Sequence, residues 1–287
     1  MYLITGVTGH LGNAAAEAFL QQEGASKLTV LSRSHEKAKS WAERGVGVKI
    51  GDYNDYNSLV NAFKGVEKLL FVSSNDLENR ESHHRNVIAA AKAAKVNHVI
   101  FTSFQYQSTA EDSPNGLMPV YKATEDLLIA SGLTYTILRN GIYMDMLPDI
   151  IGPAIREGKV LFAPAGDTPV AFTSRNDLAQ AAANVLVKDG FENRIIDLVN
   201  GQRVRFQEIA DQLGDVLKLK ITYLNVSDTE YQQALLDAGL PPIVVGLFVG
   251  ILKSIKAGEF DKTGTDLEAI LGRTPLQVKD FLEAYYA

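Results

Sequence analysis

The first residues of the chain constrain its fold more than any other stretch. A short apolar run, Tyr2–Thr5, leads directly into the glycine-rich segment Gly6–Gly12, and an alanine-rich stretch follows at Asn13–Gln22. This order predicts a strand, a tight turn and a helix. In such a unit the glycines let backbone amides approach a diphosphate, and the helix N-terminus supplies partial positive charge to it. The segment therefore predicts a bound dinucleotide, with a purely structural turn as the alternative.

Apolar, β-rich runs then alternate with helical patterns through about half of the chain. Such alternation predicts right-handed crossovers and a doubly wound parallel sheet, which is an α/β fold of the Rossmann type. Continuous apolar runs such as Leu69–Val72 suit strands that are buried on both faces. The predicted strands are Tyr2–Thr5, Leu28–Ser32, Val46–Ile50, Lys68–Val72, His98–Thr102 and Tyr135–Arg139. The predicted helices are Asn13–Gln22, His35–Arg44, Asn57–Phe63, His83–Ala94 and Tyr121–Ser131.

Beyond Tyr143, prolines and glycines divide the chain into shorter pieces. We expect a dinucleotide-binding domain at residues 1–150 and a smaller, mainly helical substrate lobe at 151–287, with residues 170–200 returning to the first domain. Such a lobe would pack over the carboxyl ends of the strands, where open α/β sheets bind their ligands. The expected elements are helices at Asn176–Val187, Phe206–Leu213, Asp228–Ala238 and Pro275–Tyr286, a strand at Ile195–Leu198 and an apolar segment at Ile243–Ile255.

The composition argues against several functional classes. The formal net charge of −6 disfavours generic binding to nucleic acid or to anionic membranes. The absence of cysteine excludes disulfides, thiolate metal sites and thiol catalysis. The longest apolar run, Leu240–Leu252, is shorter than the roughly 20 residues of a membrane span, and the first residues do not form a signal peptide. We expect a cytoplasmic protein, and the sequence leaves a homodimer open.

The residue after the second predicted strand indicates which dinucleotide binds. Arg33 lies about 20 residues after Gly12, where enzymes specific for NAD(H) usually carry an acidic residue for the ribose hydroxyls. An arginine suits the 2′-phosphate of NADP(H), and Lys37 offers a second cation. We therefore expect NADP(H), with NAD(H) less favoured. The alternatives are that Arg33 lies in solvent and that Glu36 takes the ribose role.

The stretch after the third predicted strand has two interpretations. Asp52 and Tyr53 could bind the adenine amino group and flank its ring. Alternatively, Asp55 or Asn57 could simply cap the helix that follows. Both interpretations can hold, since they concern different residues.

The residues after the other strands complete the expected cofactor site. Ser73–Asn75 would line the central ribose or form only a turn. Arg139–Gly141 ends the sixth strand near the expected place of the nicotinamide. The expected cofactor-binding residues are Gly6, Thr8, Gly9, His10, Leu11, Gly12, Arg33, Asp52, Ser73, Ser74, Asn75, Arg139, Asn140 and Gly141.

The pair His83-His84 raises the question of a metal site. No nearby pattern of further His, Cys, Asp or Glu ligands accompanies it. We therefore expect no metal, and we interpret the pair as the solvated start of a helix.

The helix expected at Tyr121–Ser131 carries a chemically decisive departure. Many reductases and epimerases use Tyr-x-x-x-Lys, in which the lysine one turn later helps the phenol to exchange a proton. Here Glu125 follows Tyr121 by one turn, and an adjacent carboxylate would oppose ionisation of the phenol. Lys122 lies about 100° around the helix and cannot replace the missing lysine. Alcohol oxidation and sugar epimerisation by the usual route are not expected, and Tyr121 keeps a role only as a hydrogen-bond donor.

These motifs resemble the NmrA-like branch of the atypical short-chain dehydrogenases/reductases, and within it the group of bacterial NAD(P)H:quinone oxidoreductase type 2 and triphenylmethane reductase. The resemblance implies a dinucleotide cofactor and hydride transfer to quinones or dyes. The stretches that carry it are Ile4–Gly12, Gly51–Tyr53, Gly65–Leu70, His84–Val87, Thr124-Glu125, Leu138–Tyr143, Asp266-Leu267 and Leu271–Arg273.

Hydride transfer to an electron-poor acceptor does not need the Tyr–Lys dyad, because positioning supplies most of the catalysis. We therefore predict an NADPH-dependent oxidoreductase that reduces quinones or similar electron-poor aromatic compounds. Tyr143, Met144 and Phe248 are the expected apolar substrate wall, with ordinary core packing as the alternative. A non-catalytic redox sensor, which the resemblance also allows, and a nucleotide-sugar epimerase, which fits the fold without the dyad, are the competing functions.

Overall fold

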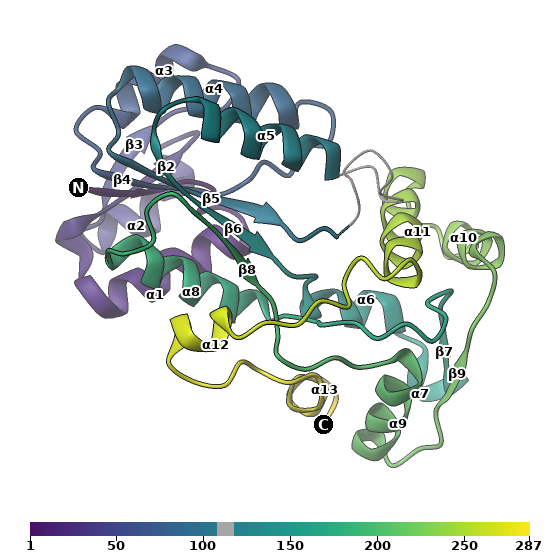
Figure 1. Cartoon of the computed structure of the whole chain (residues 1–287). Coiled ribbons are helices and arrows are strands. Elements are labelled where there is room, and N and C mark those ends of the chain that lie inside the picture. The colour runs from purple at the N-terminus through teal and green to yellow at the C-terminus, as the bar shows by residue number, and fades with distance from the viewer. Residues whose placement is uncertain (108–117) are drawn as a thin grey trace.

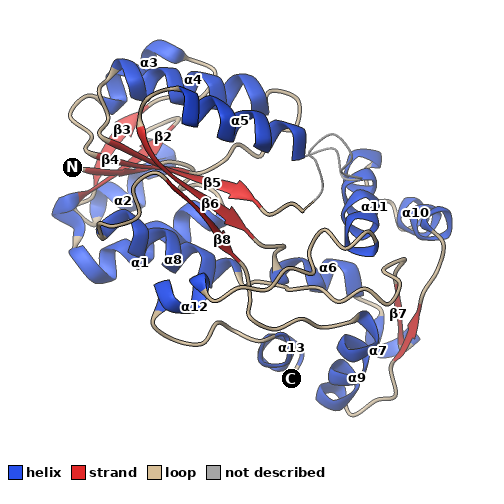
Figure 2. Ribbon diagram, in the orientation of Figure 1, coloured by secondary structure: helices blue, strands red, loops and turns tan. Residues whose placement is uncertain are grey.

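A computed structural model describes residues 1–107 and 118–287, and within them the main feature is a seven-stranded parallel sheet between two layers of helices (Figures 1 and 2). The strand order is β3-β2-β1-β4-β5-β6-β8, so the chain changes direction across the sheet between β1 and β4. The predicted doubly wound Rossmann arrangement is confirmed. The strands are β1 (Tyr2–Ile4), β2 (Leu28–Ser32), β3 (Gly47–Ile50), β4 (Lys68–Phe71), β5 (His98–Phe104), β6 (Thr134–Asn140) and β8 (Arg194–Leu198).

The parallel register brings the carboxyl ends of the strands to one edge of the sheet. Tyr2 pairs with both Leu28 and Lys68, and β5 runs beside β6 as far as the pair Phe104–Asn140. The central strands are buried on both faces, as their continuous apolar runs predict. The loops that leave neighbouring strands at this edge therefore lie close together.

Helices cover both faces of the sheet (Figure 1). Phe63, Phe71 and Leu128 lie in the core on one side, and the alanine-rich faces of two helices pack with Phe19 and Leu178 on the other. The first layer is α3 (Tyr56–Phe63), α4 (Arg80–Ala93) and α5 (Met118–Ala130), and the second is α1 (His10–Glu23) and α8 (Arg175–Val187).

A smaller, mostly helical region lies beyond the carboxyl ends of β5, β6 and β8 (Figure 2). It has its own apolar core, which contains Phe172, Phe206 and Leu252. None of the helices in the described ranges has the length and apolar character that a membrane span requires. The elements of this region are α6 (Leu147–Ile151), α7 (Ile155–Gly158), β7 (Val160–Phe162), α9 (Phe206–Leu217), β9 (Thr222–Leu224), α10 (Asp228–Asp237), α11 (Pro242–Lys256) and α13 (Val278–Tyr286).

The middle of the chain returns to the main sheet. β8 pairs with β6 in parallel, and α8 packs beside α1. Near the C-terminus, α12 (Asp266–Leu271) packs on α8, where the Asn184 side chain donates to the carbonyl of Ile270 over 2.8 Å. The chain therefore passes between the sheet and the smaller region more than once.

The structure differs from the predicted elements mainly in short segments. The helix predicted at His35–Arg44 is a 3-10 turn at Glu36–Ala38 followed by α2 (Lys39–Glu43), because the backbone of Ala38 leaves helical geometry. The last helix begins at Val278 instead of Pro275. The strands β7 and β9 and the helices α6, α7 and α12 were not predicted, since segments of a few residues show no clear period.

Candidate active site

The turn after β1 is held tightly by its glycines. The N–H of Gly9 donates to the carbonyl of Gly6 over 2.9 Å, and Gly6 has φ +67°, a left-handed conformation that favours glycine. A Cβ atom on Gly12 would overlap the Gly6 carbonyl group, so only glycine lets α1 start this close to the turn. No side chain caps α1, which leaves the first amides of the helix free to bind an anion.

Side chains around the turn point in different directions. Thr8 and His10 are exposed, whereas the Leu11 side chain is buried in the core. Leu11 can therefore serve a cofactor only through its backbone amide.

A cleft of about 320 Å³ lies against this turn and reaches the start of α8. Arg175 and Asp145 border it, although sequence reasoning did not single them out. The only available signal was the place of Arg175 at the start of a helix expected near the sheet. The lining residues are Thr8, Gly9, His10, Asn13, Ala14, Asp145, Arg175 and Asn176.

Arg33 directly follows β2, at the carboxyl edge of the sheet. Its side chain is exposed, and it forms no hydrogen bond or ion pair with any residue that the structure describes. Asp52, after β3, accepts a hydrogen bond from the N–H of Asn54 over 2.9 Å. Asp55 caps α3 by accepting from the N–H of Ser58, as one of the two interpretations of this stretch expected.

Tyr53 turns its hydroxyl inward. The oxygen lies 2.6 Å from the Thr5 hydroxyl and 2.8 Å from the carbonyl of Val72, and burial raises the pKa of this phenol. The ring packs edge-on against Phe71. Its polar end is therefore engaged in the fold, and the expected contact of Tyr53 with an adenine ring finds no support in this geometry.

The His83-His84 pair is buried, so its interpretation as a solvated helix start is wrong. α4 begins earlier, at Arg80. Ser74 donates its N–H to Nε2 of His84 over 3.0 Å, and its hydroxyl lies 2.9 Å from Nδ1 of His83. Nδ1 of His84 lies 2.8 Å from the hydroxyl of Thr124. Among the residues described, no three or more His, Cys, Asp or Glu side chains gather as metal ligands would.

The surroundings of His84 keep its ring neutral. Burial, aided by the charges of Arg80 and His83, lowers the pKa of His84 to about 3. Through their hydrogen bonds with Ser74, the two histidines hold the loop after β4 against α4. Ser74 uses its N–H and its hydroxyl in these bonds to the histidines. Of the three residues expected to contact a ribose, the Ser73 hydroxyl and the exposed Asn75 therefore remain available.

Tyr121 lies beside the Ser73 hydroxyl. The two oxygen atoms are 3.4 Å apart, and the Arg80 guanidinium lies 5.4 Å from the centre of the Tyr121 ring. Arg80 also donates from Nε to the carbonyl of Ser74 over 2.7 Å. The tyrosine is thus held at the edge of the sheet between α4 and the loop after β4.

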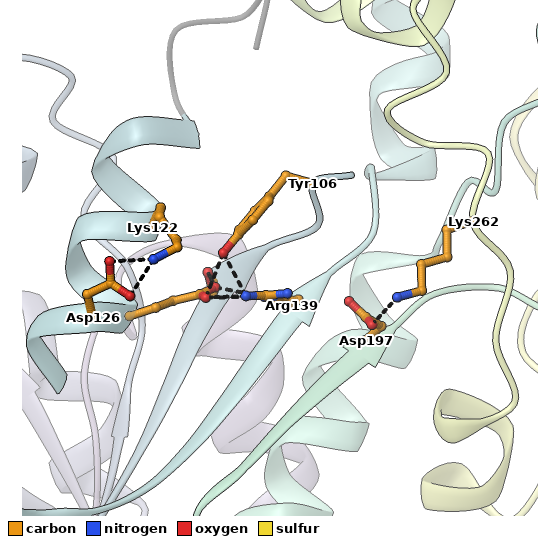
Figure 3. A network of polar contacts seen from close by, with 8 residues as sticks. Tyr106, Lys122, Asp126, Arg139, Asp197 and Lys262 are labelled. Atoms are coloured by element: carbon orange, nitrogen blue, oxygen red, sulfur yellow. Dashed lines mark hydrogen bonds and ion pairs between the residues drawn. The ribbon is translucent and has the colours of Figure 1, made fainter. Parts of the chain in front are cut away.

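Glu125 lies one turn after Tyr121 on α5, and its carboxylate is bonded to three partners from the neighbouring strands and the loop after β5. It accepts hydrogen bonds from the hydroxyls of Ser103, at 2.5 Å, and Tyr106, at 2.9 Å. Arg139 donates to it from Nε over 3.0 Å and from Nη2 over 2.5 Å. Figure 3 shows Tyr106 and Arg139 directed toward the same point at the ends of the strands. Burial and the Glu125 charge raise the pKa of Tyr106.

The ion pair between Glu125 and Arg139 leaves no net charge at this position. The Glu125 side chain is 1% exposed and that of Arg139 is 21% exposed, so water screens the pair poorly. Lys122 points away and pairs with Asp126 on the surface (Figure 3). Arg139 is therefore committed to a neighbour, and neither basic side chain replaces the lysine of the Tyr-x-x-x-Lys motif.

Some residues at the end of β6 and just after it lie near the cleft, and others lie in the core of the smaller region. Asn140 is buried at the end of β6, and burial raises the pKa of Tyr143 to about 12. The N–H of Gly141 donates to the carbonyl of Leu198 over 2.9 Å. Met144 is fully buried and Phe248 is 8% exposed, both in the core of the smaller region. Of the expected substrate wall, Tyr143 lies nearest to the cleft, and Met144 packs as the core alternative described.

Comparison with known proteins places this geometry in a family. The sequence model of the NmrA-like family matches residues 2–261. The chain belongs to the NmrA-like family. This NmrA-like chain is 36% identical over 273 residues to quinone oxidoreductase 2 of Escherichia coli (strain K12), covering 95% of this chain and 94% of that protein. It is 27% identical to the NAD(P)H azoreductase of Xenophilus azovorans, covering 84% of this chain and 82% of that protein.

Two solved structures share the fold of this NmrA-like chain almost throughout. Citrobacter sp. triphenylmethane reductase complexed with NADP(H) superposes with a TM-score of 0.94 at 35% identity, covering 99% of each chain. The Escherichia coli quinone oxidoreductase QOR2 complexed with NADPH gives a TM-score of 0.94 at 33% identity, covering 100% of each chain. The family resemblance expected from the motifs is confirmed.

Proposed function

We propose that this chain is an NADPH-dependent oxidoreductase that reduces quinones or similar electron-poor aromatic compounds by direct hydride transfer. The observation that carries the proposal is the cleft against the glycine-rich turn, with the unpaired Arg33 at the end of the adjacent strand. The similar proteins support it, because they are named as reductases of quinones, azo compounds and triphenylmethane dyes, and two of their structures hold NADP(H) or NADPH.

The residues present fit a bound NADPH. The lack of space for a Cβ at Gly12 brings the free amides of α1 to the turn, where they would hold the diphosphate. Arg33 would bind the 2′-phosphate, since its guanidinium has no partner among the described residues and suits a phosphate. The Ser73 hydroxyl lies where the ribose on the nicotinamide side would pass.

NADPH, when bound, supplies the hydride; the chain supplies position and a suitable electrostatic setting. The Glu125–Arg139 pair is neutral as a unit, so it does not supply the free cation that the lysine of the Tyr-x-x-x-Lys motif supplies. Tyr121 would donate a hydrogen bond from its hydroxyl to an acceptor oxygen. A quinone already attracts a hydride and takes its remaining proton from water, so positioning carries the catalysis.

The quinone or dye that accepts the hydride would lie beside the ring of Tyr143. This ring stands between the end of β6 and Arg175, which lies 4.8 Å from the ring centre. We further propose that residues 1–150, with the returning segment 170–200, bind the dinucleotide and that the rest of the chain bounds the acceptor. Phe248, on α11, contributes to that boundary from the smaller region.

A turnover assay tests the proposal. Purified protein is mixed with NADPH and a simple benzoquinone, and in parallel with an azo dye and a triphenylmethane dye, while NADPH absorbance is followed. We expect NADPH consumption that depends on both protein and acceptor. Saturable NADPH binding without turnover of any of these acceptors would overturn the enzyme proposal and leave the non-catalytic redox sensor. In a separate assay, the protein is incubated with a nucleotide sugar and its dinucleotide. Epimerisation of the sugar would favour an epimerase instead.

A further inference from the structure

Arg80, at the start of α4, is a buried cation that forms no ion pair with any residue that the structure describes. The residue is 7% exposed. Its Nε donates to the carbonyl of Ser74 over 2.7 Å, whereas its Nη1 is buried and has no hydrogen-bond partner among the described residues. Burying a charge without a counter-charge is costly, so the place of this cation calls for a functional explanation.

The Arg80 charge lies against the tyrosine of the candidate active site. Its guanidinium is 5.4 Å from the centre of the Tyr121 ring, a cation–π contact. The Tyr121 hydroxyl, 3.4 Å from that of Ser73, is the group that would donate to an acceptor oxygen. An acceptor bound there would therefore experience the field of Arg80 across the phenol ring. Because Arg80 is buried, water and salt screen this field weakly.

The titratable groups packed nearby do not cancel the Arg80 charge. The carboxylate of Glu125, on the same helix as Tyr121, is already paired with Arg139. The ring of His84 is neutral, because burial, followed by the charge of Arg80, lowers its pKa to about 3. Arg80 therefore contributes positive charge beside Tyr121.

The acceptors named for two of the similar proteins, a quinone and a triphenylmethane dye, respond oppositely to positive charge. A quinone that gains a hydride, while NADPH is oxidised to NADP⁺, becomes a hydroquinone monoanion and then takes a proton from water. A triphenylmethane dye is a cation, and a hydride that forms a C–H bond at its central carbon gives a neutral product. A fixed cation stabilises the negative charge that develops on the quinone, and it opposes binding of the dye.

We infer that Arg80 makes this site select neutral, carbonyl-bearing acceptors such as quinones over cationic dyes, with its charge acting across the Tyr121 ring. This inference rests on the proposed function and narrows its substrate class. Arg80 is a positioning residue, since it acts on the acceptor through Tyr121. It also holds the loop after β4 through Ser74, and loss of that contact alone would impair both kinds of acceptor equally.

Steady-state rates at saturating NADPH measure the selectivity. For each acceptor, kcat/KM is divided by the rate constant of the same acceptor with NADPH in buffer, which removes the difference in intrinsic reactivity. We expect the wild type to favour a neutral benzoquinone over a cationic triphenylmethane dye. Arg80→Gln should lower this ratio by about ten-fold or more, and Arg80→Lys, which keeps the charge, should lower it much less. The matched control Arg85→Gln removes the same charge from an exposed pair with Glu81 on the same helix and should not change the ratio.

Equilibrium binding gives a second readout that does not depend on turnover. The same dye is titrated into protein saturated with NADP⁺, which carries no hydride to transfer. Because Arg80 repels the dye, we expect Arg80→Gln to lower Kd for the dye by about ten-fold. Arg85→Gln should leave this Kd as it is in the wild type.

Several outcomes overturn the inference. Equal losses with quinone and dye in Arg80→Gln do so, since a purely structural role predicts them, and so does an unchanged Kd for the dye. Should Arg80→Gln fail to fold, the wild type decides, because a normalised rate with the dye equal to or above that with the quinone also overturns it. If the wild type binds NADPH but turns over no acceptor, the proposed function itself fails; if it turns over either one, only the role of Arg80 is at issue.

Discussion

At the scale of single residues, Glu125 most clearly distinguishes this site from that of reductases with the Tyr-x-x-x-Lys motif. It occupies the position of the dyad lysine, yet it is buried and bonded to Ser103, Tyr106 and Arg139. A buried carboxylate is tolerable only when its charge is paired and its oxygens accept hydrogen bonds, and both conditions hold here. The same contacts occupy both of its carboxylate oxygens.

Glu125→Gln tests the strength of this pairing. The substitution keeps the volume but removes the charge opposite Arg139, so we expect the free energy of unfolding to fall by about 1–3 kcal/mol, less than for a fully buried pair because Arg139 is partly exposed. Urea unfolding measures it. The control Asp126→Asn removes the same charge from the exposed pair with Lys122 and should change stability by less than about 1 kcal/mol. Equal effects of the two substitutions would contradict the argument.

Arg33 sets the preference between cofactors. Arg33→Asp places a carboxylate where the 2′-phosphate would lie, so we expect KM for NADPH to rise by about ten-fold or more relative to KM for NADH. Steady-state rates with a quinone and each cofactor measure this ratio. An equal loss with both cofactors would remove the argument that Arg33 recognises the phosphate.

At the scale of elements, the contact between α1 and the turn before it limits what residue 12 can be. A methyl group on Gly12 would overlap the Gly6 carbonyl, so α1 has to shift outward. We expect Gly12→Ala to destabilise the protein by roughly 1–3 kcal/mol, as overpacking does, and to weaken NADPH binding by more than about ten-fold. Thermal unfolding and NADPH titration measure the two effects.

Gly246, inside α11, offers the matched control for this substitution. No atom lies within contact distance of a Cβ there, and the residue is exposed. Gly246→Ala should therefore stabilise the protein by about 0.5–1 kcal/mol, because alanine favours helix, and leave NADPH binding unchanged. Loss of cofactor binding in both variants would show that the effect at Gly12 is not local.

The elements that sequence predicts well are those with a long pattern. The strands of the sheet and the helix Asn176–Val187 lie within a residue or two of their predicted bounds, because their apolar runs and periods are clear. The partners within the site were harder to foresee. Tyr106 and Arg139 reach Glu125 from neighbouring strands, and Arg175 meets the turn only after the chain returns to the sheet. Such contacts depend on packing between elements that local sequence does not reveal.

At the scale of the whole molecule, stability should depend on pH through His84. Its pKa is about 3 in the folded protein and near 6.5 when unfolded, so only the unfolded chain takes up this proton as the pH falls between these values. The free energy of unfolding should therefore drop by about 2 kcal/mol between pH 7 and pH 5 from this residue alone. His98, whose pKa burial also lowers, adds to the drop.

Urea unfolding of wild type and His84→Asn at pH 7 and pH 5 measures this contribution. The substitution should lessen the drop by about 2 kcal/mol whatever its effect at neutral pH. The control His35→Asn changes an exposed histidine and should leave the drop as it is in the wild type. The same drop in His84→Asn as in wild type would show that the buried histidine does not govern it.

The late position of β8 has a consequence for how the chain is made. β8 is the last strand of the sheet, and it follows a long excursion through the smaller region. While a ribosome is still synthesising that excursion, β6 presents an unpaired edge with free N–H and C=O groups. At about 5–20 residues per second, this edge stays open for seconds, long enough to meet other nascent chains. This nascent chain is therefore most exposed to edge-to-edge association before β8 has been translated.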